Sequence, residues 1–252
     1  MMLLNYSGID IDSCAADIVK KYYRTAEVFR RHGIEYCCGG KWPLKMVCET
    51  RDIDPEQLLN ELRVAARDIR ISNKLPFSEW DTDFIISYIV NIHHQYLKQM
   101  LPSLKEQLEK FVDEHREKYG YLSELERLFN FVYKTIIPHL REEEDVIFPY
   151  IRQIAHAYES KESYAGLLVR TLRKPVESMM HQEHETMGKV LKEFRTMTDN
   201  YTTPANACTS HRLSFCLLQE LDDDLVQHLY LENVVLFPRA LAMEKELLQR
   251  PA

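Results

Sequence analysis

The chain has 252 residues, a formal charge of −7 and only seven glycines. Its length allows one large domain or a large domain with a small one, and an acidic balance without a basic block argues against nucleic acid or an anionic membrane as partner. No segment approaches the roughly 18 apolar residues of a membrane span, and the N-terminus lacks the features of a signal peptide. The sequence therefore predicts a cytoplasmic protein, in which six cysteines are more typical of thiols or metal ligands than of disulfides.

The first part of the chain predicts a small helical domain over residues 1–75. Helical spacing of apolar residues predicts a helix over about 12–32, with Gly33 as its C-terminal cap. A turn over residues 34–43 is followed by another helical stretch, and a further helix begins after Asp54, which acts as N-cap with Pro55 at the first helical position, and runs to about residue 70. Residues 72–78 break the helical pattern and form the predicted linker to the second domain.

Two adjacent cysteines, Cys37 and Cys38, lie in a glycine-flanked turn of this small domain. Adjacent cysteines seldom reach disulfide geometry without strain, so exposed thiols available for redox chemistry or metal transfer are one interpretation. A buried turn with incidental thiols is the other, and the sequence alone does not choose between them.

The remaining residues, 76–252, predict an antiparallel four-helix bundle, so the fold class is all-α. Four long apolar-periodic stretches are joined by short connections, which is typical of such bundles. The predicted helices cover about 82–117, 121–152, 163–198 and 208–247.

One motif occurs twice within this bundle. A histidine followed four residues later by a glutamate, and then by Phe-Pro, stands at His139/Glu143 and again 89 residues later at His228/Glu232. A spacing of four residues is one helical turn, so each imidazole and carboxylate lie on the same face. A further histidine precedes each copy at a similar distance, namely His94 and His184. The chain thus contains two matching half-sites.

Heptad spacing places these six polar side chains at positions otherwise occupied by core hydrophobic residues. Buried ionised carboxylates are costly unless they are paired or bind a metal, so the register predicts a metal site. Mixed imidazole and carboxylate ligands suit iron or manganese, and a bridging role for each glutamate would accommodate two ions. The predicted ligands are His94, His139, Glu143, His184, His228 and Glu232.

Neighbouring polar residues are assigned to other roles. His93 lies about 100° around the helix from His94 and is predicted to flank the site. His181 is three residues before His184, so it is either a fifth histidine ligand or an outlying residue. Glu142 and Glu144 fall outside the heptad seam and are expected on a solvated face.

These motifs together resemble a known family. The spacing of the six ligands, with Phe-Pro after each pair, is similar to a hemerythrin-like domain, and Tyr36-Cys37-Cys38-Gly39-Gly40 resembles the small N-terminal domain of the iron–sulfur cluster repair di-iron proteins, the repair-of-iron-centres family. The resemblance implies two non-haem iron ions, bridged by Glu143 and Glu232, and four histidine ligands.

The resemblance also implies a function: repair of iron–sulfur clusters damaged by oxidative or nitrosative stress, through a labile di-iron centre. Damaged iron–sulfur proteins are then the expected partners, with NO or O₂ as small ligands and no nucleic acid or membrane. The alternatives are a hemerythrin-like sensor or scavenger of NO or O₂, and an oxidoreductase that reduces NO at the same centre. The oligomeric state is open, with a homodimer as one candidate.

Overall fold

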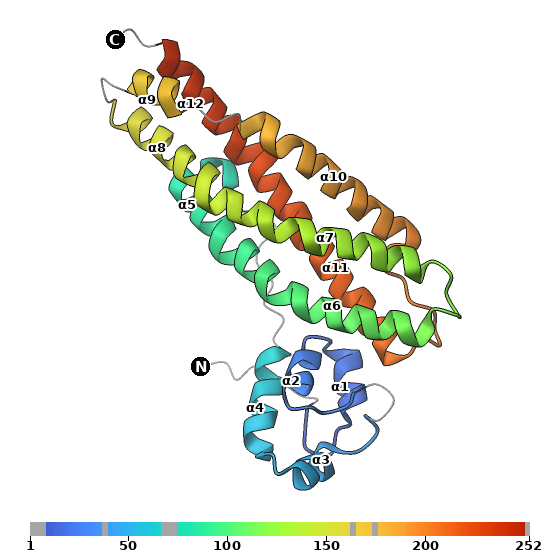
Figure 1. The fold of residues 1–252 in the computed structure, drawn as a ribbon. Helices are drawn as coiled ribbons and strands as arrows, with labels where there is room; N and C mark the ends of the chain where they lie inside the picture. The colour runs from blue at the N-terminus through green and yellow to red at the C-terminus, as the bar shows by residue number, and fades with distance from the viewer. Residues whose placement is uncertain (1–8, 37–39, 67–74, 162–164, 173–175, 250–252) are drawn as a thin grey trace. The chain divides into compact units, whose positions relative to one another are not determined.

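The computed structural model describes residues 9–36, 40–66, 75–161, 165–172 and 176–249. These residues are mostly helical and contain no β-strand; Cys14 and Pro43 form only an isolated bridge (Figure 1). The all-α prediction is therefore confirmed. None of the described helices is both long and apolar enough to cross a bilayer.

The N-terminal residues form four short helices: α1 (Ala15–Lys21), α2 (Thr25–Arg31), α3 (Leu44–Arg51) and α4 (Pro55–Ala65). The single helix predicted over 12–32 is wrong, because the chain breaks at Tyr22, whose φ of −134° and ψ of 76° are not helical. The start of α4 is as predicted, since the Asp54 carboxylate accepts hydrogen bonds from the backbone N–H groups of Glu56 and Gln57.

The first of two compact units combines residues 1–73 with residues 201–218. Its apolar core contains fully buried side chains such as Phe29, Leu44 and Leu58, and Leu213 belongs to the same core. Leu213 lies in α11 (Thr209–Tyr230), so one segment of that long helix packs with the N-terminal helices. The predicted division at residue 75 is close to one unit boundary, but the first unit also takes in part of the later chain.

The second unit, residues 74–200 and 219–252, carries the bundle. Helix α7 (Leu122–Glu142) packs against both α6 (Gln95–His115) and α10 (Val176–Met197), and the later part of α11 follows the same direction in Figure 1. The elements are η1 (Phe77–Glu79), α5 (Thr82–Tyr88), η2 (Ile89–His94), α6 (Gln95–His115), α7 (Leu122–Glu142), η3 (Glu143–Ile147), α8 (Phe148–Glu159), α9 (Ala165–Leu172), α10 (Val176–Met197), η4 (Leu231–Leu236) and α12 (Phe237–Gln249).

Three of these elements, η2, η3 and η4, are π-helical turns inserted into otherwise α-helical rods. In η3 the N–H of Phe148 donates to the carbonyl of Glu143, five residues back, and in η4 Phe237 donates to Glu232 in the same way. A proline follows each phenylalanine and cannot donate a helical hydrogen bond, which favours a local widening of the helix. Short π-turns of this kind occur often at functional sites.

Candidate metal centre

The bundle brings all six predicted ligands together in its interior. His94 ends η2, Glu143 begins η3 and Glu232 lies in η4, while the other three histidines lie in the α-helices α7, α10 and α11. His94, Glu143, His228 and Glu232 are fully buried, and His139 and His184 are 7% and 4% exposed. The inward orientation predicted from the heptad register is therefore observed for each residue.

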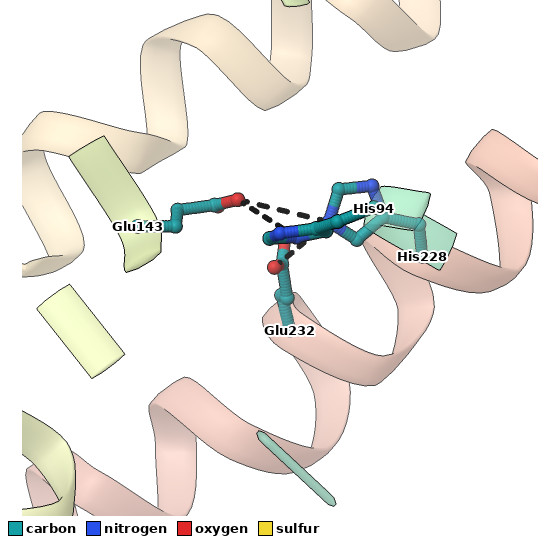
Figure 2. A group of neighbouring side chains, drawn as sticks. All are labelled: His94, Glu143, His228 and Glu232. Atoms are coloured by element: carbon teal, nitrogen blue, oxygen red, sulfur yellow. Dashed lines mark hydrogen bonds and ion pairs between the residues drawn. The ribbon is translucent and has the colours of Figure 1, made fainter. Parts of the chain in front are cut away.

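The six side chains fall into two overlapping groups that could each hold a metal ion. One group is His94, Glu143, His228 and Glu232, drawn in Figure 2. The other contains His139 and His184 with the same two glutamates. Within each group the potential ligand atoms lie within 4.8 Å of one another.

Glu143 presents one oxygen to each pair of histidines. Its Oε1 lies 3.1 Å from the Nε2 of His139 and 3.7 Å from that of His184. Its Oε2 lies 3.4 Å from the Nε2 of His94 and 3.8 Å from that of His228. The carboxylate thus stands between the two pairs.

Glu232 is divided in the same manner. Its Oε1 lies 2.9 Å from the Nε2 of His228, and its Oε2 lies 3.5 Å from the Nε2 of His184. Each half of the repeat therefore contributes a carboxylate that faces both histidine pairs.

A divalent cation fits this set of nitrogen and oxygen ligands, because several of these atoms make no hydrogen bond to the described residues. The Nε2 of His94, both oxygens of Glu143 and the Oε2 of Glu232 are buried without a hydrogen-bond partner. Unpaired buried polar atoms are costly, and nitrogen and oxygen donors of this kind are metal ligands when they converge.

The pKa values of the metal-free cluster lead to the same conclusion. Burial and the charge of Glu143 raise the pKa of Glu232 well above its usual value. Burial also raises the pKa of Glu143, but contacts with His139 and other histidines outweigh burial and hold it well below the usual range. Burial lowers the pKa of His228 to about 3. Two adjacent buried carboxylates cannot both be charged without a compensating cation.

Hydrogen bonds at the outer ring nitrogens orient three of the histidines. The Nδ1 of His94 lies 2.7 Å from Glu144, that of His139 lies 2.7 Å from Glu183, and that of His184 lies 2.8 Å from Asn233. Such partners fix the imidazole tautomer and leave Nε2 for a metal. The expectation that Glu144 lies on a solvated face is wrong, because its side chain reaches across to His94.

Sequence reasoning missed these outer partners, although a signal was present. Glu144 and Asn233 each directly follow the glutamate of their half-site, so they occupy equivalent positions in the repeat. His93 is also more than a flanking residue: it is 1% exposed and its Nδ1 lies 2.9 Å from Asp224 Oδ1. Cys37 and Cys38 lie outside the described residues, as does the side chain of His181.

A cavity of about 340 Å³ adjoins the cluster on the side of His139 and His184. Phe131, Ile136 and Met187 give it apolar walls, and the two histidines line it together with His228. A cavity of this size could admit small molecules to the histidine and glutamate cluster.

Comparison with known proteins assigns the chain to a family. Residues 86–240 match the hemerythrin HHE cation-binding domain, and residues 11–66 match ScdA_N, a domain of unknown function. The iron–sulfur cluster repair protein YtfE of Enterobacter sp. (strain 638) is 30% identical, with 92% of this chain and 98% of the relative aligned. The chain belongs to this family of iron–sulfur cluster repair proteins. YtfE proteins of Escherichia coli O17:K52:H18 and Shigella boydii serotype 4 are each 31% identical over 88% of this chain and 93% of their own length.

The family assignment accounts for both halves of the sequence pattern. The matched hemerythrin region contains all six buried histidine and glutamate side chains, and the matched N-terminal region contains the Cys37-Cys38 pair. The cation-binding description of the family also agrees with the donor chemistry of the cluster.

Proposed function

We propose that this protein repairs iron–sulfur clusters damaged by oxidative or nitrosative stress, and that it does so in the cytoplasm with two non-haem iron ions. Glu143 and Glu232 would bridge the ions, with one histidine pair on each. The arrangement of each carboxylate, one oxygen toward each histidine pair, is the observation that carries this proposal. The names of the relatives supply the substrate class, damaged iron–sulfur proteins.

The protein's own residues would perform two tasks. The π-turns place Glu143 and Glu232 at the centre of the bundle, and the outer partners Glu144, Glu183 and Asn233 fix the histidine tautomers. His94 is fully buried and does not line the cavity, whereas His139, His184 and His228 all line it. Bound iron would supply redox chemistry and would itself be the cargo that a damaged cluster lacks.

The cavity also supports a second candidate function, binding or reduction of NO or O₂. It adjoins His139 and His184 and is large enough for a diatomic ligand. This alternative uses the same ions without transferring iron to another protein, so iron balance separates the two functions.

The test uses purified holoprotein and a [4Fe–4S] hydro-lyase inactivated with an NO donor. We expect two iron ions per chain and recovery of hydro-lyase activity with stoichiometric loss of iron from the repair protein. A variant with Glu232→Ala, and an equal amount of free ferrous iron with a chelator, are the controls. Recovery without iron transfer would favour the redox alternative, and one tightly held zinc ion per chain would contradict both.

A further inference from the structure

The repeat that builds the metal centre is not symmetric around its outer shell of hydrogen bonds. In the first half, Glu144 accepts a hydrogen bond from His94 Nδ1 through its Oε1, at 2.7 Å. In the second half the equivalent residue is Asn233, which accepts from His184 at 2.8 Å but carries no charge. The two half-sites therefore differ where each outer partner meets its histidine.

A lysine strengthens the difference. The Nζ of Lys98 donates to both oxygens of Glu144, at 2.7 and 2.9 Å. Lys98 lies four residues after His94, one helical turn, so the lysine and the histidine reach Glu144 from the same face. At the equivalent position of the second half, four residues after His184, stands Gly188, which provides no cation.

The other histidines lack this arrangement. Glu183, the partner of His139, has a side chain that is 56% exposed, and none of the ion pairs among the described residues joins it to a lysine or arginine. The Nδ1 of His228 is buried and makes no hydrogen bond within the described residues. Glu144, by contrast, is held on both oxygens, with its side chain 25% exposed.

We propose that Lys98 is a positioning residue that holds Glu144 against His94, and that it thereby makes the two metal positions unequal. The ion held by His94 and His228 would dissociate more slowly than it would without this clamp. A carboxylate fixed at Nδ1 keeps the imidazole in the tautomer whose Nε2 lone pair faces the metal, and a cation on that carboxylate prevents it from turning to solvent. The inference rests on the proposed pair of iron ions.

The first test measures how fast each iron ion leaves reduced holoprotein for a ferrous chelator, under anaerobic conditions. Lys98→Met should accelerate the loss of one ion of the two by roughly threefold to tenfold, less than the roughly tenfold to hundredfold expected for removing a direct outer partner. Lys98→Arg should restore the rate. Lys105→Met is the matched control. Like Lys98, Lys105 lies on α6 and pairs with a glutamate, and the side chain of Lys105 is 32% exposed against 31% for Lys98.

A double variant tests whether Lys98 acts through Glu144. In a Glu144→Ala background, Lys98→Met should change the rate of iron loss no further. Equal rates in Lys98→Met and Lys105→Met, or independent effects in the double variant, would overturn the proposal. Equal acceleration of both ions would do so as well, because Lys98 and Glu144 contact a histidine of only one of the two ligand groups.

Transplanting the clamp provides a gain-of-function test. A Cβ added at Gly188 meets no atom within 4 Å, so a side chain can start there without a clash. Gly188→Lys with Asn233→Glu should slow the loss of the other ion, whereas Gly188→Lys alone should not. No slowing in the double variant would contradict the proposed role. Iron content of the parent protein separates the two proposals: fewer than two ions would refute the di-iron centre itself, and two ions with unchanged rates would refute only Lys98.

Discussion

The Nε2 atoms of His139 and His184 lie 3.1 Å apart, although the residues are 45 positions apart in the sequence. Both histidines direct Nδ1 to an oxygen, of Glu183 and Asn233 respectively, so each Nδ1 donates its hydrogen. Two Nε2 lone pairs would then face each other unless a proton or a metal ion lies between them. This contact links metal binding to proton release.

Metal binding to the metal-free protein should therefore release protons at neutral pH. Burial lowers the pKa of His139, but the contact with Glu143 and its charge, together with Glu232 and Glu183, raise it to about 9. His139 is thus protonated at pH 7 and must lose a proton when it becomes a ligand. Calorimetry of ferrous iron binding, in anaerobic buffers of different ionisation enthalpy, measures the number released.

The sign of the pH effect follows from the direction of the shift. The folded-state pKa of His139 exceeds the unfolded value of about 6.5. The contact of protonated His139 with Glu143 therefore stabilises the metal-free protein fully below pH 6.5, and this stabilisation is lost as the pH rises through 9. Apparent metal affinity should increase over the same interval. Affinity that does not change between pH 7 and 9 would show that no proton is displaced from His139.

Substitution of either bridging candidate should abolish tight iron binding. Glu143→Ala or Glu232→Ala removes a carboxylate from both ligand groups at once. The affinity for both iron ions should therefore fall by about tenfold or more. Asp145→Ala is the control, since Asp145 is exposed and two residues from Glu143. Iron analysis after gel filtration is the measurement, and equal iron content in the three variants would refute the bridging assignment.

Asn233 should matter through His184. Asn233→Ala removes the oxygen that accepts the Nδ1 hydrogen, which should weaken metal binding roughly tenfold to hundredfold without unfolding the bundle. Val234→Ala is a suitable neighbour for comparison, because Val234 is 58% exposed. Competition with a chelator gives the affinities, and an Asn233 variant that matches the Val234 variant would show that the hydrogen bond has no influence.

The two adjacent cysteines should affect repair but not the metal centre. Cys37→Ser with Cys38→Ser leaves all six proposed ligands in place, so the optical spectrum of the iron-loaded protein should be unchanged. Exposed thiolates are suitable transient ligands, and their loss should slow recovery of a damaged iron–sulfur enzyme severalfold. The rate of hydro-lyase reactivation is the readout. Unchanged repair would mean that the thiols are incidental, and loss of iron would mean that they contribute to the centre.

The heptad pattern was sufficient to place the six histidine and glutamate side chains inside the bundle, but it did not find their outer hydrogen-bond partners. A heptad assigns each residue to the inside or the outside of a bundle, and Glu144 lies at the border between them, where contact depends on the neighbouring helix. The π-turns also disturb the register. Val146 lies three residues after Glu143, where a regular heptad would place a core residue, but it is only half-buried. Ile147 is fully buried instead, because the extra residue in η3 rotates the following helix.

The break in the first predicted helix has a similar explanation. Apolar spacing continues through Tyr22, and nothing local to the sequence required the helix to end there. Residues Tyr22 to Arg24 separate α1 from α2, and both helices contribute side chains to one core that includes Phe29. Tertiary packing thus decided the end of the helix, against a continuous local pattern.

Helix α11 contributes residues to both compact units, which restricts how the protein can be divided into separate fragments. Leu213 packs in the core of the first unit, while His228, on the same helix, belongs to one of the two groups that could hold a metal ion. A protein that lacks residues 1–75 would leave Leu213 without its apolar neighbours. Replacement of Leu213 by a polar residue should therefore make such an isolated bundle more soluble. Residues 201–218 belong to the same unit as the N-terminal helices, so a chimaera that exchanges these helices between relatives should exchange residues 201–218 with them.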